Sequence, residues 1–577
     1  YNGCKPSYSC WSQRYSHYNS SLQTVVDETG LPFWVVNTCK PTAEVCNGKD
    51  DDCDEAVDED EVCEREALLI GQSWVAPAKT SDIDGDGKAD VCGRGMSGMW
   101  CHLSTGTAWG EKGEVLPLSD SSGWDDATNF GTFRMGDIDG DGKADLCARA
   151  NGAVGCWKSD GAKLVTPVEG PAWSDESGWG GFQFHSTMRL MDIDGDGKDD
   201  LCARAAKGIV CHKSTGAGFG AQLDGPAWSD GQGLNQAKYY GTLRDGDVNG
   251  DRKADLCMRT QQGMECWLSD GNGFPTKVPG PGWSDAGGWG GFQYWSTIRL
   301  IDVNGDGKDD LCARDSQGLR CHFSDGTAFA EAIEVGALSD ASGWNDASNF
   351  LTLRTGDIDG DGSQDLCIRA NAKLLCYRWD GTAFQSIDGP AWSDADGWNK
   401  DEYFHTIQMG DMNGDGKADL CARHVAGWRC HPSTGTGFGD AVSLAEFADA
   451  GGWAASKYFS TILFGGPSCV SKTETCNGKD DDCDGEVDEG ACPPGDSGAA
   501  GAGQAGAGQG GAGQAGNAGA SASGGAGSPS WAGAPDDDSG CGCRTAGGSR
   551  SSALAAFALL GLATALARRR ARSVTRV

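Results

Sequence analysis

The sequence predicts an all-β protein built around a seven-bladed β-propeller. Three observations support this fold class: a unit of 54 or 55 residues recurs seven times, its short apolar strands alternate with Gly-rich turns, and no unit shows helical periodicity. Self-similar all-β units of about 40 to 50 residues or more are typical of propeller blades, and four to eight blades close a ring. A parallel β-helix is the main alternative, but its repeats are far shorter.

Length and composition agree with an exported repeat protein. A chain of 577 residues exceeds what one hydrophobic core usually accommodates. Asp and Glu number 83 against 47 Lys and Arg, so the net charge is −36. Because nucleic-acid binding needs a basic face, we expect no nucleic-acid partner. The 26 cysteines indicate an oxidising compartment and paired thiols.

The chain divides into six segments by composition. A Gly/Ala-rich stretch has almost nothing to bury and is predicted to be a flexible linker. The chain starts at Tyr1 rather than Met, so we expect either a removed leader or a fragment. The predicted segments are an N-terminal segment 1–38 with a Cys4/Cys10 pair, a Cys/Asp module 39–63, the propeller 64–466, a second Cys/Asp module 467–492, the linker 493–540 and a sorting tail 541–577.

The tail has a three-part order. Cys541 and Cys543 precede an apolar run at 551–567, and an Arg-rich cluster follows at 568–572. The run is at the short limit for a membrane helix, and the arginines place its C-terminal end in the cytoplasm. This order resembles the MYXO-CTERM sorting signal of myxobacterial surface proteins. The resemblance implies loss of the helix and delivery to the bacterial cell surface, outer membrane or medium, with membrane contact only before processing; a permanent anchor is the alternative.

Each repeat contains an acidic loop of the type DIDGDGKAD. Positions 1, 3, 5 and 9 carry carboxylates, position 7 can offer its backbone carbonyl, and glycines at positions 4 and 6 let the chain fold around an ion. Hard oxygen ligands at alternate positions suit Ca²⁺, whereas Mg²⁺ demands tighter octahedral geometry. The loop lacks the Glu at position 12 and the flanking helices of an EF-hand. We therefore expect an affinity of about 10⁻⁴ to 10⁻³ M; a metal-free surface turn is the alternative.

The predicted ligands follow from these positions. Asn249, Asn304 and Asn413 replace the second Asp and remove one charge each, and Arg252 replaces the second Gly, which makes the fourth loop the weakest candidate. In loop order, the ligands are Asp82, Asp84, Asp86, Lys88 and Asp90; Asp137, Asp139, Asp141, Lys143 and Asp145; Asp192, Asp194, Asp196, Lys198 and Asp200; Asp247, Asn249, Asp251, Lys253 and Asp255; Asp302, Asn304, Asp306, Lys308 and Asp310; Asp357, Asp359, Asp361, Ser363 and Asp365; Asp411, Asn413, Asp415, Lys417 and Asp419.

The loops resemble the FG-GAP or VCBS repeats of integrin-α-like propellers over about 67–466. This resemblance implies seven blades, Ca²⁺ ions that stiffen interstrand loops, and a role in binding; it supplies no ligand. Ring closure is predicted from the sequence itself. The last repeat ends in an orphan lead-in at 451–466 that reaches no acidic loop, and we expect it to complete the N-terminal blade and remove the exposed edge.

Each repeat also has two cysteines nine residues apart. They lie at equal distances from a tight turn, so antiparallel pairing would bring their Cβ atoms within disulfide range. Metal ligation is the alternative, although no second pair lies nearby in sequence. The predicted disulfides are Cys92–Cys101, Cys147–Cys156, Cys202–Cys211, Cys257–Cys266, Cys312–Cys321, Cys367–Cys376 and Cys421–Cys430.

The two Cys/Asp modules are near copies of each other. They contain Cys39, Cys46, Cys53 and Cys63 in the first and Cys469, Cys476, Cys483 and Cys492 in the second. The motif resembles the MopE-like metal-binding motif, whose name is associated with copper. Neither module contains the His or Met that copper favours. Paired cysteines around a calcium cage are therefore preferred, with copper left open; the cage ligands are Asp480, Asp482, Asp484, Asp488 and Glu489.

Aromatic and histidine side chains also recur at fixed positions. His102, His212, His322 and His431 follow the second cysteine of their repeats, and Trp173, Trp228, Trp283 and Trp392 precede Ser-Asp. One interpretation is packing between blades, which we favour for the separate Gly-Trp series. The other is a set of pockets in which sugar rings stack on Trp and hydroxyls meet Ser-Asp. Burial of all four Trp would count against a lectin.

These observations favour a binding protein over an enzyme. The sequence shows no nucleophile elbow, HExxH or phosphate loop, so we expect no catalytic activity. The predicted function is that of a secreted or surface calcium-binding propeller that binds or adheres to a glycan, in the manner of a lectin, or to a surface protein. The alternatives are a structural calcium-stabilised envelope protein and an accessory domain of a secreted enzyme.

Overall fold

The computed structural model describes residues 22–26, 32–36 and 79–466, apart from residue 337. Strands β1 (Leu22–Val26) and β2 (Pro32–Val36) pair antiparallel. The Cys4/Cys10 pair, both Cys/Asp modules, the linker and the sorting tail lie outside the described residues. Within those residues, no helix combines the length and apolar character that a bilayer span requires.

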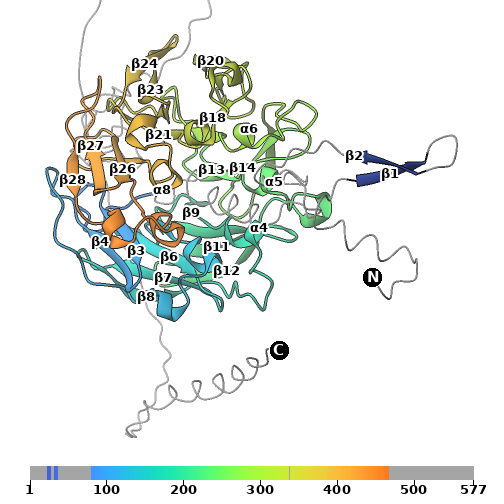
Figure 1. The fold of residues 1–577 in the computed structure, drawn as a ribbon. Helices are drawn as coiled ribbons and strands as arrows, with labels where there is room; N and C mark the ends of the chain where they lie inside the picture. The colour runs from blue at the N-terminus through green and yellow to red at the C-terminus, as the bar shows by residue number, and fades with distance from the viewer. Residues whose placement is uncertain (1–21, 27–31, 37–78, 337, 467–577) are drawn as a thin grey trace, which may run out of the picture. The chain divides into compact units, whose positions relative to one another are not determined.

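Six four-stranded antiparallel sheets form most of the repeat region (Figure 1). In each sheet the strands pair in chain order, so every sheet is a simple meander. The sheets are β5 (Arg134–Gly136), β6 (Asp145–Arg149), β7 (Val154–Ser159) and β8 (Leu164–Glu169); β9 (Arg189–Met191), β10 (Asp200–Ala205), β11 (Gly208–Ser214) and β12 (Phe219–Asp224); β13 (Arg244–Gly246), β14 (Asp255–Arg259), β15 (Met264–Leu268) and β16 (Thr276–Pro279); β17 (Arg299–Ile301), β18 (Asp310–Arg314), β19 (Leu319–His322) and β20 (Ile333–Gly336); β21 (Arg354–Gly356), β22 (Asp365–Arg369), β23 (Leu374–Trp379) and β24 (Phe384–Asp388); and β25 (Gln408–Gly410), β26 (Asp419–His424), β27 (Gly427–His431) and β28 (Val442–Leu444).

The first repeat contributes a two-stranded sheet, β3 (Val91–Gly95) and β4 (Gly98–His102). Isolated bridges flank this hairpin: Cys92 pairs with Leu463 on one side, and Met99 pairs with Leu116 on the other. The Cys92 amide donates to the Leu463 carbonyl at 3.0 Å, and the Leu463 amide donates back at 2.9 Å. The orphan lead-in therefore pairs with the first repeat, as the sequence predicts.

A backbone hydrogen bond recurs between the acidic loops of successive repeats. The amide at loop position 8 donates to the carbonyl of the first loop Asp in the preceding repeat, at 2.6 to 2.7 Å. The series includes the bond from Ala89 in the first repeat to Asp411 in the last, so the two ends of the array are joined in the same way as its interior. Figure 1 shows the sheets following one another around this path in chain order.

A one-turn helix precedes the first strand of each four-stranded sheet, and a seventh precedes the lead-in residue Leu463 that pairs with Cys92. The sequence-based expectation of repeats without helices was wrong in this detail, because a single turn is too short to show a 3.6-residue period. Asp126 and Asp346 cap two of these helices by accepting a backbone N–H. The helices are α3 (Ala127–Phe130), α4 (Phe182–His185), α5 (Ala237–Tyr240), α6 (Phe292–Trp295), α7 (Ala347–Phe350), α8 (Asp401–Phe404) and α9 (Ser456–Phe459).

The core lies between successive sheets. One cluster, for example, joins Cys147 and Val168 of one sheet to Leu190 and Leu201 of the next. All seven predicted repeat disulfides are present, with Cα–Cα distances of 4.0 to 4.1 Å. Each joins directly paired residues of two neighbouring strands, as in Cys202 and Cys211 of β10 and β11. The disulfides therefore tie the two middle strands of each four-stranded sheet and the two strands of the β3–β4 hairpin.

Candidate metal loops and the Trp179 pocket

The first Asp of each acidic loop organises the loop backbone. In the second loop, Asp137 Oδ1 accepts the Gly140 amide at 2.7 Å, and Oδ2 accepts the Gly142 amide at 2.8 Å. Both glycines have positive φ, the region that L-residues avoid. Arg252 adopts φ 63° at the position of the second Gly and still donates its amide to Asp247 at 2.6 Å. The fourth loop thus keeps the common fold.

The ninth loop Asp is buried and engaged by backbone donors. Asp200 accepts the Ile193 amide at 3.1 Å on Oδ2 and the Ser214 amide at 2.6 Å on Oδ1. Burial, partly offset by these hydrogen bonds, raises the pKa of this carboxyl. The pKa rises to about 7 in Asp145, Asp200 and Asp255, and to about 8 in Asp90, Asp310, Asp365 and Asp419.

Four loops bring carboxylate oxygens within 4.8 Å of one another, in groups that could hold a metal ion. These loops are the ones with Asp at the third position. Oδ1 of that Asp is buried without a hydrogen-bond partner in Asp139, Asp194 and Asp359. An unpartnered buried carboxylate oxygen among other oxygen ligands fits a hard cation. The groups are Asp82, Asp84 and Asp86; Asp137, Asp139 and Asp145; Asp192, Asp194 and Asp200; and Asp357, Asp359 and Asp365.

A basic side chain compensates the third loop position in three repeats. Lys158 Nζ lies 2.7 Å from Asp139, and Lys213 Nζ lies 2.9 Å from Asp194. Arg378 pairs with Asp359 in the same way. Where the third loop residue is Asn, the residue matching Lys158 is uncharged; these residues are Leu268, Phe323 and Pro432. The first loop is the exception, because its Asp84 is matched by Leu103.

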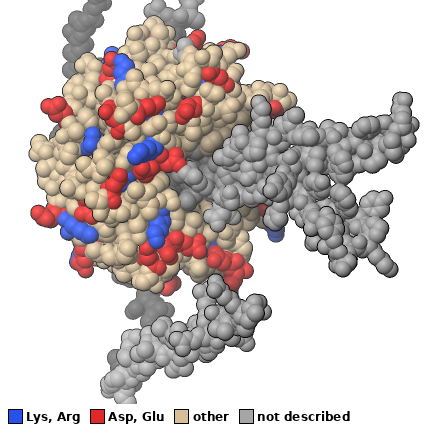
Figure 2. Space-filling model, in the orientation of Figure 1, with Lys and Arg blue, Asp and Glu red and all other residues tan. Residues whose placement is uncertain are grey.

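The lysines at loop position 7 cover the fifth-position Asp. Lys198 Nζ, for example, lies 2.8 Å from Asp196 Oδ2. Lys88, Lys143, Lys253, Lys308 and Lys417 make the same type of pair. Figure 2 accordingly shows blue basic atoms next to red acidic atoms on the face in view. Because the predicted metal ligand at position 7 is the backbone carbonyl, the lysine side chain at the same position can neutralise a loop carboxylate.

The four predicted histidines have a common structural partner. Nδ1 of His102, His212 and His431 lies 2.9 Å from a glycine carbonyl, and His322 is 2.8 Å from the Ala330 carbonyl. Since a carbonyl only accepts, Nδ1 carries the proton. Burial lowers the pKa of His322 and His431. Burial thus favours the neutral form of these two rings, and the Nδ1 hydrogen bond fixes the orientation of all four.

The four predicted Trp side chains are buried. Their exposed fractions are 5% for Trp173, 2% for Trp228, 5% for Trp283 and 3% for Trp392. Three of them stack on the Trp of the Gly-Trp series, with centroid distances of 4.4 to 4.6 Å, and meet a His edge-on at 5.6 to 5.8 Å. By the criterion set from the sequence, the burial of all four Trp counts against a lectin, and these rings offer no face for sugar stacking. The stacked pairs show that the Trp side chains of the Gly-Trp series are used for packing, as we expected from the sequence.

The Asp of the Ser-Asp element is already occupied. It pairs with the buried Arg two residues after the first cysteine of each repeat, as in Arg204 with Asp230 at 2.5 Å and Arg94 with Asp120 at 2.8 Å. The buried guanidinium needs this counter-charge, so one oxygen of the carboxylate is used within the fold, and its contact with ligand hydroxyls stays a prediction. The other pairs are Arg149–Asp175, Arg259–Asp285, Arg314–Asp340, Arg369–Asp394 and Arg423–Asp449.

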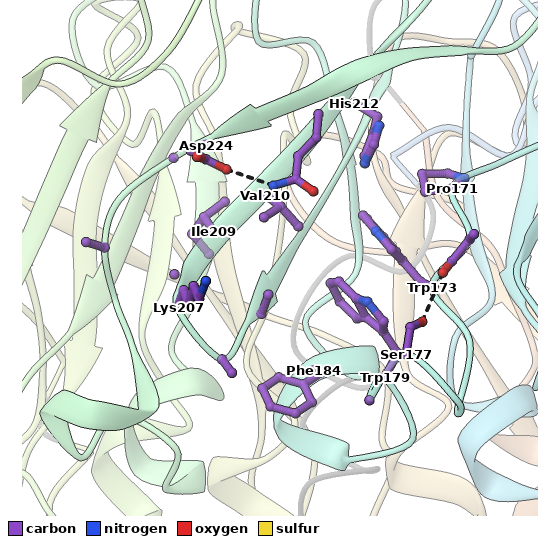
Figure 3. A pocket seen from close by; sticks show the side chains of 18 residues that line it. Pro171, Trp173, Ser177, Trp179, Phe184, Lys207, Ile209, Val210, His212 and Asp224 are labelled. Carbon is purple, nitrogen blue, oxygen red and sulfur yellow. Dashed lines mark hydrogen bonds between the residues drawn. The ribbon is translucent and has the colours of Figure 1, made fainter.

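An open pocket of about 920 Å³ lies beside one Trp–Trp–His group (Figure 3). We call it the Trp179 pocket. Trp173, Trp179 and Phe184 line one side, and β11 lines the other with Val210 and His212. Lys207, Gln222 and Asp224 also line it, and Gln222 Nε2 donates to Asp224 at 2.8 Å. The pocket thus has an aromatic wall and a rim with one cation and one carboxylate.

Several of these residues escaped sequence reasoning. Lys207, Val210 and Gln222 line the Trp179 pocket but belong to no recurring motif. Their positions vary between repeats, so a search for repeated residues passes over them. Lys158 and its counterparts could have been found from the sequence, because the third loop residue and the residue two after the second cysteine vary together in every repeat except the first.

Comparisons with known proteins agree with this architecture. A family model described as an FG-GAP-like repeat matches residues 82–148, 247–313, 302–368 and 357–422. No curated protein matches the chain. A solved Agrocybe aegerita lectin, described as specifically recognising non-reducing terminal N-acetylglucosamine, is 18% identical with a TM-score of 0.55. The match covers 66% of this chain and 96% of the lectin.

Two further solved structures are similar at lower TM-scores. PorZ, a surface component of the type-IX secretion system of Porphyromonas gingivalis, is 12% identical with a TM-score of 0.35, and the match covers 64% of this chain and 39% of PorZ. The Photorhabdus luminescens Tc holotoxin pore is 17% identical with a TM-score of 0.36, covering 63% and 15%. The described region of this chain is an all-β propeller that carries FG-GAP-like repeats, Asp-rich groups in its loops and disulfides in its sheets.

Proposed function

We propose that the protein is an exported, non-catalytic binding propeller of seven blades. In this proposal the seventh blade is the β3–β4 hairpin between Leu463 and Leu116, which repeats the strand order of the other sheets. The bond from Ala89 to Asp411 supports closure at this point. Seven disulfides favour an oxidising compartment. The sorting tail outside the described residues would deliver the protein to the cell surface or the medium.

Calcium is the metal we propose for the loops. Oxygen ligands from the first, third, fifth and ninth positions match its preference for carboxylates and carbonyls. The unpartnered oxygens of Asp139, Asp194 and Asp359 are the best-placed ligands. The ninth-position Asp, which already accepts backbone hydrogen bonds, would contribute a further carboxylate oxygen. When bound, the ion would neutralise carboxylates that otherwise repel one another. Its role is therefore structural.

Carbohydrate is the ligand class we propose, and the Trp179 pocket is the observation that carries it. The half-buried Phe184 and the exposed edge of Trp179 offer an apolar surface to a sugar ring, and Gln222, Asp224 and Lys207 offer donors and acceptors to hydroxyls. With one cation and one carboxylate, the rim favours a neutral, polyhydroxylated ligand. The fold shared with a lectin that recognises N-acetylglucosamine supports the same class.

A glycan array with the full chain tests this function. The array should include glycans ending in N-acetylglucosamine and be run once with calcium and once with chelator. We expect selective binding with calcium and weaker binding with chelator, because the loops hold neighbouring sheets together. Flat signals in both conditions would contradict carbohydrate binding.

A structural role in the envelope is the second candidate. The burial of Trp173, Trp228, Trp283 and Trp392 favours it, because most of the recurring aromatic surface is used for packing. Under this alternative, chelation would still destabilise the protein while no glycan would bind. Binding to a surface protein without glycans, detected by pull-down from deglycosylated envelopes, would separate adhesion from a purely structural role.

A further inference from the structure

We propose that the Trp179 pocket is the single open member of a repeated set of pockets, and that the side chain before the second cysteine of each repeat decides which member admits a sugar ring. This inference rests on the proposed carbohydrate-binding function and specifies the number of binding sites per chain. It makes the protein a monovalent receptor, although its scaffold repeats seven times.

The deciding position is occupied by Val210 in the Trp179 pocket. Val210 lies on β11 directly before Cys211, pairs with Ala203 in the sheet and lines the pocket opposite the aromatic side chains (Figure 3). The position has the same register in every repeat, because the neighbouring cysteines pair directly. Its other occupants are Trp100, Gly155, Glu265, Arg320, Leu375 and Arg429.

The Arg429 copy is the closest comparison. Trp392 and Trp398 stack at 4.4 Å there, and His431 meets Trp392 at 5.7 Å, which repeats the arrangement of Trp173, Trp179 and His212. Arg429, however, places its guanidinium carbon 5.9 Å from the centroid of the Trp398 ring. A cation that already occupies the face of the indole leaves no stacking surface for a sugar.

Two more copies are filled by direct contacts. Glu265 accepts a hydrogen bond from Trp228 Nε1 at 2.5 Å and pairs with Lys277. Trp100 packs edge-on against Trp453 at 5.8 Å and carries Lys112 Nζ 3.2 Å from its ring centroid. These side chains satisfy one another, so a ligand would have to displace an existing interaction.

The remaining copies carry other obstructions. Gly155 is small, but the ring of Trp157 lies over it, 3.5 Å from where a Cβ would stand. Arg320 forms an ion pair with Asp315 at 3.2 Å and donates a hydrogen bond to Gln317 at 2.6 Å, both in the turn between β18 and β19. Leu375 adds bulk and packs with the neighbouring core. Val210 is therefore the one occupant that is neither long, charged nor covered by a neighbouring indole.

The polar rim of the Trp179 pocket also differs from that of the Arg429 copy. Lys207, Gln222 and Asp224 correspond to Ala426, Ala441 and Ser443 beside Arg429. The Trp179 pocket thus combines space with hydrogen-bonding groups along its rim. An apolar face and a neutral polar edge together select a monosaccharide rather than an anion or an aliphatic chain.

Isothermal titration calorimetry of the full calcium-loaded chain tests the inference, with N-acetylglucosamine as the probe. We expect a stoichiometry near one. Val210→Arg should weaken binding at least tenfold, and Val210→Leu should weaken it as well; Leu is the natural occupant of this position in another repeat, so the second variant keeps the fold. The matched control is Leu375→Arg, which adds the same charge and bulk at a closed copy and should leave affinity unchanged.

The outcomes separate the inference from the proposed function. A stoichiometry of three or more would overturn the single-site inference and leave carbohydrate binding standing. Unchanged binding by both Val210 variants would place the sugar elsewhere and also overturn it. No binding by the unaltered protein, to this sugar or to any glycan of the array, would overturn both.

Discussion

The acidic loops and the pocket walls belong to the same repeats but differ in what they keep constant. In the loops, the first Asp accepts the same backbone amides in every described repeat, even where Arg252 replaces glycine. In the walls, the residue before the second cysteine ranges from Gly155 to Trp100. Residues that hold neighbouring sheets together are under the same physical demand in every repeat, whereas a ligand site needs only one copy.

This difference teaches where to look for function in a repeat protein. Recurring Trp and His side chains attract attention in the sequence, yet the structure uses them as packing and as fixed hydrogen-bond partners. The Trp179 pocket arises where a recurring framework of Trp173, Trp179 and His212 meets non-recurring neighbours. Predictions about the loops should therefore affect the whole ring, and predictions about single positions should have local effects.

Removal of calcium should have the largest effect. A site that binds only the folded state stabilises it by about 2.7 kcal/mol at a hundredfold excess over the dissociation constant, and several loops would contribute. We expect chelation to lower the melting temperature of the full chain and added calcium to restore it. Differential scanning calorimetry measures this, with magnesium at equal concentration as the control; an unchanged melting temperature would contradict the metal assignment.

The pH dependence of the metal-free protein should be next in size. The pKa of Asp90, Asp365 and Asp419 is about 8 in the folded state, against an ordinary value of 3.8. The folded state therefore binds more protons than the unfolded state between about pH 4 and 8. Stability should fall as pH rises across this window and level off above it.

Calcium should reverse this trend, because protons compete with the metal for the same carboxylates. Thermal unfolding of calcium-depleted protein and of calcium-loaded protein, recorded from pH 4.5 to 8.5, would show the two opposite slopes. A metal-free protein that gains stability with rising pH would contradict the role given to the buried ninth Asp.

Removal of a compensating lysine should have a smaller, local effect. Lys158→Met deletes the cation beside Asp139. Ion pairs at the surface are worth about 0.2 to 1 kcal/mol, so we expect calcium to bind the 137–145 loop about 1.4- to fivefold more tightly. Crystal structures at limiting calcium would report the occupancy of each loop.

The matched control for this variant is Lys163→Met, because Lys163 pairs with Glu114 instead of a loop carboxylate. Equal occupancy of the 137–145 loop in the two variants would show that the Lys158 charge does not tune the site. Leu103→Lys should have the converse effect on the first loop, where Asp84 lacks a basic neighbour at this position.

Arg252→Gly should have the smallest effect. Arg252 adopts φ 63°, where a non-glycine residue costs about 1 to 2 kcal/mol. Part of the gain is offset by the greater backbone freedom of glycine in the unfolded chain, so the net stabilisation should be below about 1 kcal/mol. Urea denaturation measures this change. Gly197→Arg, at the same position of the third loop, should destabilise by a similar amount, and stabilisation there would contradict the argument.

Much of the architecture was predictable from periodicity alone. The 54- or 55-residue repeat predicted the meander sheets, and the nine-residue spacing predicted all seven disulfides because cysteines equidistant from a tight turn must face each other. The pairing of Leu463 with Cys92 was predictable from an unused lead-in. The one-turn helices were not, since α3 to α9 are each shorter than the pattern that reveals a helix.

The sequence by itself determined the repeat, the disulfide partners and the positions of loop carboxylates, because these depend on spacing along one chain. Only the tertiary structure decided that the Ser-Asp carboxylates are consumed by buried arginines and that the four Trp residues are packed away. It also decided that a cavity lies between Val210 and the aromatic side chains of Trp173, Trp179 and Phe184. These outcomes depend on which side chains from neighbouring repeats compete for the same space and the same hydrogen-bond partners.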